Sequence, residues 1–130
     1  MIVIDSSALM AILANEPDAE RCQHVIEGAE EVLMSSVTLS EVLVVADQRE
    51  VGDDMRRLID LIGPRIVALD AAGAYRVAQA YRRWGKGRAP AKLNFGDCHA
   101  YELAASRGCP LLFVGNDFSQ TDIRSALASD

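Results

Sequence analysis

The chain has 130 residues, half of them hydrophobic and a quarter charged, as in a single globular domain. No stretch approaches the roughly 20 apolar residues of a membrane span, and the short apolar start lacks the basic lead of a signal peptide. The net charge of −6 argues against broad electrostatic binding to nucleic acid, and three cysteines without a CxxC pair argue for reduced thiols in the cytoplasm.

The first half of the chain alternates between apolar runs and helical patterns. In chain order it predicts a strand at 1–4, helices at 7–13 and 17–26, and a strand at 32–36. Continuous apolar runs of this kind are typical of strands in a parallel sheet that is covered on both faces. Ser7 is a suitable N-cap for the first helix, and Gly28 is a stop signal after the second.

The second half continues this alternation. In chain order it predicts a helix opened by Thr38 or Ser40, a helix at 55–62, a strand at 66–69, helices at 71–83 and 97–107, and a strand at 111–114. Gly63 and Gly108 are stop signals, and Asn94 is a candidate N-cap. The order predicts one domain over 1–130, an α/β fold with a three-layer α/β/α sandwich and a mostly parallel sheet of four to five strands.

Four carboxylates are predicted to meet at one edge of this sheet: Asp5, Glu41, Asp97 and Asp117. Asp5 ends the first strand and Asp117 follows the last one, and the carboxyl ends of parallel strands line the ligand crevice of such folds. Clustered carboxylates need a cation, and oxygen ligands without nitrogen or sulfur favour Mg²⁺ or Mn²⁺. We therefore expect metal-dependent phosphodiester chemistry.

Each acid also has a purely structural explanation. Asp5 can cap the helix that follows it, and Glu41 and Asp97 lie in predicted first helical turns, where the helix dipole favours a negative charge. Asp117 follows Asn116 in ordinary turn chemistry. Capping does not explain why all four acids fall at the same end of the sheet, because purely structural acids would be scattered over the surface.

Positive charge is concentrated in one segment of the chain. Six basic residues and no acidic residue lie between 71 and 95. The candidate contacts for an RNA backbone in this segment are Arg82, Arg83, Lys86, Arg88 and Lys92. A solvated helix face that runs into a flexible loop is the alternative explanation, and Trp84 is either a stacking platform for a base or a core residue.

Four segments of the sequence resemble the PIN-domain ribonucleases, specifically the VapC toxins of bacterial toxin–antitoxin modules. The segments are IVIDSSAL, SSVTLSEV, NFGDCHAYELA and LLFVGNDFSQTDI, in this order over nearly the whole chain. The resemblance assigns the family's acidic site to Asp5, Glu41, Asp97 and Asp117. It leaves Asp122 as an additional or alternative acid, with Ser6 and Asn116 as supporting polar residues.

The resemblance implies an endoribonuclease toxin with a PIN-like fold, a Mg²⁺ or Mn²⁺ cofactor, a cognate VapB-like antitoxin, and a toxin homodimer within a larger complex. Hydrolysis of this kind leaves a 5′-phosphate and a 3′-hydroxyl. Leu9, Ile12 and Leu13 are either an apolar partner surface or core residues. His24 and His99 are expected at the surface or in the core, not at the acids.

Two other classes of protein fit part of this pattern. A metal-dependent phosphatase or phosphoacceptor domain also has an Asp after its first strand, but it carries a second Asp close by, where this chain has Ser6 and Ser7. A catalytically silent RNA- or protein-binding module would keep the basic segment and need no metal. Metal-dependent internal cleavage of RNA distinguishes a nuclease from both.

Overall fold

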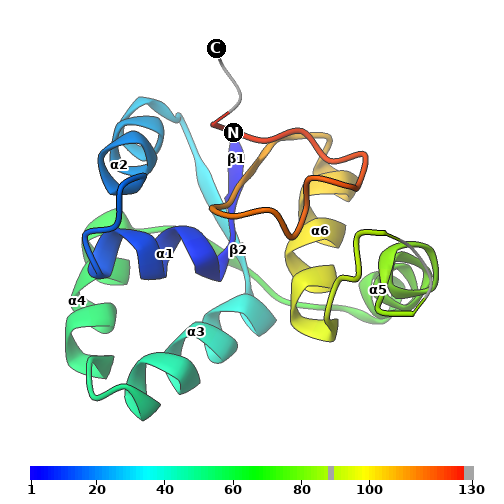
Figure 1. Ribbon diagram of the computed structural model, residues 1–130, viewed down its shortest axis with the longest axis horizontal. Coiled ribbons are helices and arrows are strands. Elements are labelled where there is room, and N and C mark those ends of the chain that lie inside the picture. Colours follow the sequence, from blue (N-terminus) through cyan, green and yellow to red (C-terminus); the bar gives the residue numbers. More distant parts are fainter. Residues whose placement is uncertain (88–89, 128–130) are drawn as a thin grey trace.

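Four parallel strands form the centre of the molecule, shown in Figure 1 as a computed structural model that describes residues 1–87 and 90–127. They are β1 (Ile2–Ile4), β2 (Val32–Ser35), β3 (Arg65–Val67) and β4 (Leu111–Leu112), in the spatial order β3-β2-β1-β4. Every neighbouring pair is parallel, which confirms the predicted class of sheet. Arg88, one of the predicted RNA contacts, lies outside the described residues.

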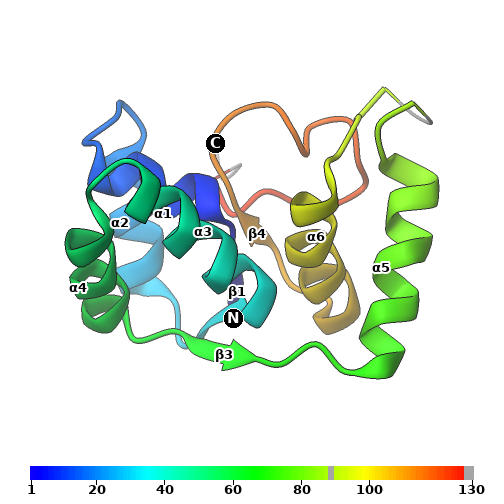
Figure 2. The same ribbon diagram turned by 90° about the horizontal axis from the view of Figure 1, so that it is seen from below.

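Helices cover both sides of this sheet. They are α1 (Ser6–Leu13), α2 (Ala19–Gly28), α3 (Ser36–Gln48), α4 (Gly52–Ile62), α5 (Ala71–Trp84) and α6 (Phe95–Arg107). Figures 1 and 2 show α1 to α4 gathered on one side, and α5 and α6 on the other, so the three-layer prediction is confirmed. No described helix is long and apolar enough to cross a membrane.

Two core clusters fill the spaces between the layers. One packs the first four helices against residues of the sheet, and the other packs α5 and α6 against it. Leu9 and Ile12 are buried in the first cluster, where they are 1% and 8% exposed, and Leu13 packs against it. These three residues are therefore core residues and do not form an open partner surface.

The end of β2 determines where two other elements begin and end. Ser35 is the N-cap of α3, and its Oγ accepts a hydrogen bond of 3.2 Å from the backbone N–H of Val37. The helix thus begins directly after the strand, and the predicted start at Thr38 or Ser40 is wrong. Ser35 is also the last residue of β2 that pairs with β3, and its partner there is Val67. The third strand therefore ends at Val67 and not at the predicted Leu69.

The end of β1 is determined in a similar way. Of the two candidate caps, Asp5 and not Ser7 is the N-cap of α1. Its backbone N–H donates 2.9 Å to the carbonyl of Leu112, and this bond ends the pairing of β1 with β4. The last strand therefore stops at Leu112 and does not continue to Val114.

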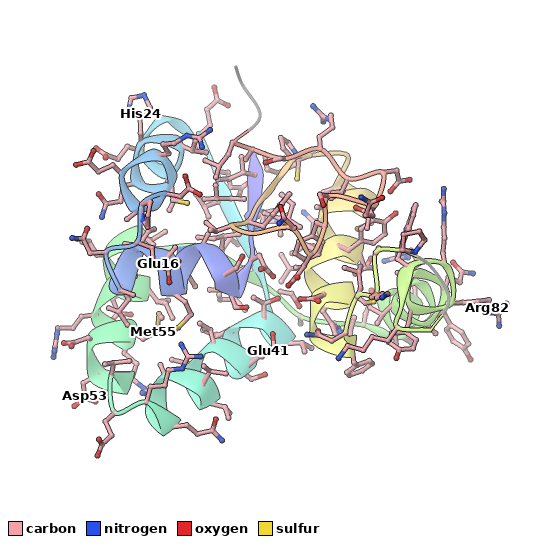
Figure 3. The ribbon with its side chains drawn as sticks, viewed as in Figure 1. Glu16, His24, Glu41, Asp53, Met55 and Arg82 are labelled. Atoms are coloured by element: carbon pink, nitrogen blue, oxygen red, sulfur yellow. The ribbon has the colours of Figure 1, made fainter. Side chains whose placement is uncertain are left out.

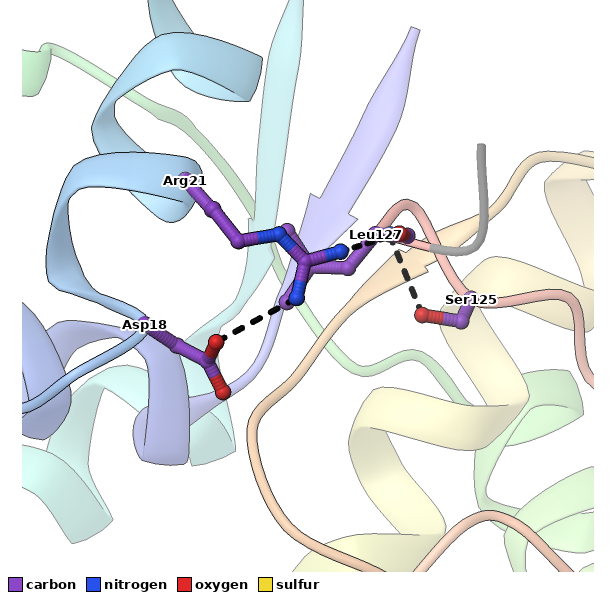
Figure 4. A network of polar contacts seen from close by, with 4 residues as sticks. All are labelled: Asp18, Arg21, Ser125 and Leu127. Carbon is purple, nitrogen blue, oxygen red and sulfur yellow. Dashed lines mark hydrogen bonds and ion pairs between the residues drawn. The ribbon is translucent and has the colours of Figure 1, made fainter. Parts of the chain in front are cut away.

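The segment after β4 returns across the molecule and is tied to α2. Arg21 forms an ion pair with Asp18 at 3.3 Å and donates a hydrogen bond of 2.8 Å to the carbonyl of Leu127 (Figure 4). The N–H of Leu127 in turn donates a hydrogen bond of 3.1 Å to Ser125 Oγ. The backbone N–H of Leu111 also donates to the carbonyl of Arg124. These bonds fix both ends of the loop that carries Asp117 and Asp122.

Candidate active site

Asp5 is the most deeply buried of the four predicted site acids, with 4% of its surface exposed. Its Oδ2 accepts hydrogen bonds from the N–H of Ser7 at 3.1 Å and from Ser7 Oγ at 2.6 Å. Burial, followed by the charge of Glu41, raises the pKa of Asp5, whereas the hydrogen bonds from Ser7 lower it. Asp5 therefore caps α1 and at the same time interacts with a second predicted site acid.

Glu41 is the sixth residue of α3, because the helix begins at Ser36. The expectation of a first-turn position is wrong, so the helix dipole does not explain an acid here. The half-buried carboxylate packs against Gly96 of α6, where a Cβ would overlap it. Figure 3 shows Glu41 near the amino-terminal end of that helix. Burial and the charge of Asp97 raise the pKa of Glu41.

Asp97 is the third residue of α6 and forms a capping box with Asn94, as the sequence predicts. Its N–H donates a hydrogen bond of 2.8 Å to Asn94 Oδ1, and its Oδ2 accepts a hydrogen bond of 3.1 Å from the N–H of Asn94. The pKa of Asp97 is raised to about 6, first by burial and then by the charges of Asp5 and Asp117. The hydrogen bond from Asn94 and the charge of Lys86 act in the opposite direction. Asp97 is thus the acid at which the others meet electrostatically.

Asp117 and Asp122 lie on one loop but face different surroundings. Asp117 is exposed, and its charge reaches Asp97. Asp122 accepts a hydrogen bond of 2.6 Å from Tyr101 Oη and lies 3.7 Å from Arg83 Nη1. It is directed towards α5 and α6, so the geometry favours Asp117 as the fourth acid.

The polar neighbours of the acids differ in part from the expectation. The hydroxyl that donates a hydrogen bond to the Asp5 carboxylate belongs to Ser7 and not to the predicted Ser6. The same Ser7 Oγ accepts a hydrogen bond of 3.0 Å from the N–H of Val114. Asn116 uses its backbone carbonyl to accept hydrogen bonds from Ser119 within the turn. Spacing alone could have suggested Ser7, because a hydroxyl two residues after an N-cap acid can reach back to it.

The two histidines lie where the sequence predicts. His24 points outward from α2 at the edge of the molecule (Figure 3). His99 is 3% exposed, stacks edge-on against Phe95 at 4.7 Å, and makes no hydrogen bond within the described residues. Burial lowers the pKa of His99, which fits a neutral core residue and not a general base.

The donor set fits a hard cation in kind, since the site offers carboxylate oxygens alone. Within residues 1–87 and 90–127, however, no three His, Cys, Asp or Glu side chains lie close enough together to form a metal-binding cluster. The acids interact in pairs: Asp5 with Glu41, Glu41 with Asp97, and Asp97 with Asp5 and Asp117. Such a loose arrangement suits Mg²⁺, which keeps several waters and needs only one or two carboxylates beside substrate phosphates.

The basic segment comes close to the acids at one residue. Lys86 lies near enough to Asp97 for its charge to lower the pKa of that carboxyl. Its backbone N–H donates 3.1 Å to the carbonyl of Leu93, which turns the chain back towards α6. Arg82 instead points away at the far edge of the molecule (Figure 3), and Lys92 is exposed. The predicted strip is therefore not a uniform surface.

Comparison with known proteins gives one consistent family. The model of the PIN domain matches residues 2–124. Ribonuclease VapC30 of Mycobacterium tuberculosis is 45% identical over 126 residues, which cover 94% of this chain and 95% of that protein. The crystal structure of M. tuberculosis VapC20, a Sarcin-Ricin loop cleaving toxin, matches with a TM-score of 0.75 and 15% identity, covering 95% and 96% of the two chains. A toxin–antitoxin complex from Klebsiella pneumoniae matches with a TM-score of 0.71 and 17% identity, covering 94% and 93%.

Proposed function

This chain belongs to the PIN-domain family, and we propose that it is a VapC-type ribonuclease toxin that hydrolyses RNA phosphodiester bonds internally with Mg²⁺ or Mn²⁺. The observation that supports this most directly is the position of Asp97. Acids that follow β1 and β4 both raise its pKa, although they lie 92 and 20 residues away in the sequence. Carboxylates that repel one another in this way are suited to a shared cation.

Asp5 and Asp97 are the residues that would hold the ion, with Glu41 and Asp117 completing its surroundings or holding a second ion. A bound ion supplies an acidified water and a positive charge beside the phosphate. Ser7 orients the Asp5 carboxylate through its two hydrogen bonds, and Gly96 leaves room for the carboxylate of Glu41. Lys86 adds a cation that attracts the backbone phosphate. Attack by water would leave a 5′-phosphate and a 3′-hydroxyl.

The partners follow from the same proposal. A VapB-like antitoxin would neutralise the toxin, and a toxin homodimer would form the core of the larger complex. The similarity in fold to a chain of a toxin–antitoxin complex supports the proposal that an antitoxin binds this protein. Action on cellular RNA would take place in the cytoplasm, which agrees with three buried cysteines that are free thiols.

The deciding experiment is cleavage of a mixed cellular RNA pool by purified protein with Mg²⁺, with Mn²⁺ or with EDTA. The Asp97→Asn variant, purified identically, is the matched control, because its amide oxygen can still accept the hydrogen bond of the capping box. We expect internal, metal-dependent cuts that the variant does not make. Equal cleavage by both proteins, or none by either, would overturn the proposal.

A further inference from the structure

A cavity of about 290 Å³ lies between α5 and α6, outside the group of four acids. Its polar and aromatic lining comes from Arg76, Gln79, Arg83, Trp84, Tyr101, Glu102 and Ser106. The cavity therefore combines aromatic rings with several hydrogen-bonding groups.

The aromatic wall of the cavity is formed by Trp84 and Tyr101. Trp84 is half-buried, and its ring lies 6.4 Å from that of Tyr101 at an interplanar angle of 60°. The hydroxyl of Tyr101 donates to Asp122, and its oxygen lies close to the indole N–H of Trp84, which is buried. Trp84 therefore presents its ring, and not its N–H, to the cavity.

The cationic wall is held in place by acids. Arg76 Nε donates 2.8 Å to Glu102, which is only 7% exposed, while nearly half of the arginine side chain stays accessible. The guanidinium of Arg83 lies 4.6 Å from the centre of the Trp84 ring. With the amide of Gln79, the cavity presents donors, acceptors and planar surfaces together. This mixture suits the edge and face of a nucleobase better than a bare phosphate.

The position of the cavity relates it to the acids. Tyr101 follows Asp97 by four residues on the same helix, which places it one turn away, about 6 Å along the axis. Trp84 is two residues from Lys86, whose charge reaches Asp97. An RNA strand with its scissile phosphate at Asp97 could therefore place a neighbouring nucleotide in the cavity.

From this geometry we infer that the cavity between α5 and α6 is a subsite for a nucleobase of the RNA substrate, close to the bond that is cut. The base stacks on the planar wall formed by Trp84 and the guanidinium of Arg83, and Arg76 and Gln79 contact its edge. The inference rests on the proposed ribonuclease function, and it adds a residue set that selects which bases lie next to the cut.

Trp84 is the only tryptophan of the chain, so its fluorescence reports directly on the cavity. We would titrate single-stranded RNA oligonucleotides into the protein in EDTA, which prevents cleavage, and follow Trp84 emission together with the anisotropy of labelled RNA. We expect saturable quenching with the same Kd as the anisotropy change. Gln79→Glu introduces an anion into the cavity and should weaken binding about tenfold.

Ala78→Glu is the matched control, since Ala78 is exposed on the same helix, outside the cavity lining, and the charge change is the same. It should leave Trp84 quenching and Kd close to those of the wild type. RNA binding without any change in Trp84 emission, or equal weakening by both variants, would overturn the subsite. A protein that quenches with RNA but never cuts it in Mg²⁺ or Mn²⁺ would support the subsite and contradict the ribonuclease.

Discussion

Glu41 and Gly96 are in direct packing contact across the interface of α3 and α6, where a Cβ on residue 96 would overlap the Glu41 carboxylate. The glycine lies one residue before Asp97, on the first turn of its helix. The absence of a side chain at position 96 is therefore what allows an acid of α3 to come close to an acid of α6.

Gly96→Ala should move the Glu41 carboxylate and lower kcat by about tenfold or more, because small misplacements of catalytic groups are costly. Stability should change little, since the overlap involves the end of a flexible side chain and alanine favours a helix by about 0.5 to 1 kcal/mol. Steady-state cleavage kinetics and thermal melts check both parts. Gly28→Ala, at a site with open space around it, is the control. Wild-type kcat in Gly96→Ala would show that Glu41 does not need its present position.

Ser7→Ala should destabilise the fold by about 1 to 3 kcal/mol, because it removes the hydroxyl hydrogen bond to Asp5 and leaves the N–H of Val114 without its acceptor. Denaturant unfolding measures the loss, and RNA cleavage should fall with it because Asp5 is less well oriented. Ser6→Ala is the matched control and should behave like the wild type. A larger effect at Ser6 than at Ser7 would contradict the contacts seen around Asp5.

Without metal, the protein should lose stability as the pH rises from about 4 to about 6. The pKa of Asp97 is about 6 in the folded protein and 3.8 in a free side chain, so the folded state holds more protons in this window. Asp5 and Glu41 act in the same direction, because their pKa values are also raised. Thermal melts in EDTA across this range measure the slope.

The same melts with Mg²⁺ should show stabilisation mainly above the pKa of Asp97, where its carboxylate is charged. Asp97→Asn should make stability in EDTA depend less steeply on pH. The variant should also melt at a higher temperature than the wild type at neutral pH, because it lacks a carboxylate whose charged form is disfavoured by burial and by neighbouring acids. A steeper slope in the variant would mean that other groups cause the pH dependence.

Lys86→Glu should weaken RNA binding and reduce its salt dependence, with the slope of log K against log salt falling by about 0.7 for the loss of one phosphate contact. Binding is best measured in the Asp97→Asn background, so that the RNA stays intact. Arg49→Glu, on an exposed residue just after α3, controls for the change in net charge. Equal effects of the two reversals would indicate a general charge effect and no specific contact at Lys86.

Much of the local structure could be predicted because local physics determines it. Gly63 and Gly108 end their helices in the left-handed conformation, with φ of 64° and 63°, which glycine adopts without strain. Asn94 caps α6 as expected. The start of α3 was predicted wrongly because Ser35 serves both as the end of a strand and as a helix cap, and an apolar run alone does not separate these roles.

The sequence alone determined the apolar runs, the stop signals, the position of Asp5 after a strand and that of Asp97 at a helix start, because each depends on neighbours a few residues away. The tertiary structure decided which side chains meet. It directs Asp122 to Tyr101 and Arg83, and it brings Lys86 to Asp97. These relationships arise from the packing of helices whose residues are far apart in the chain, and packing depends on the shape of the whole core and not on local spacing.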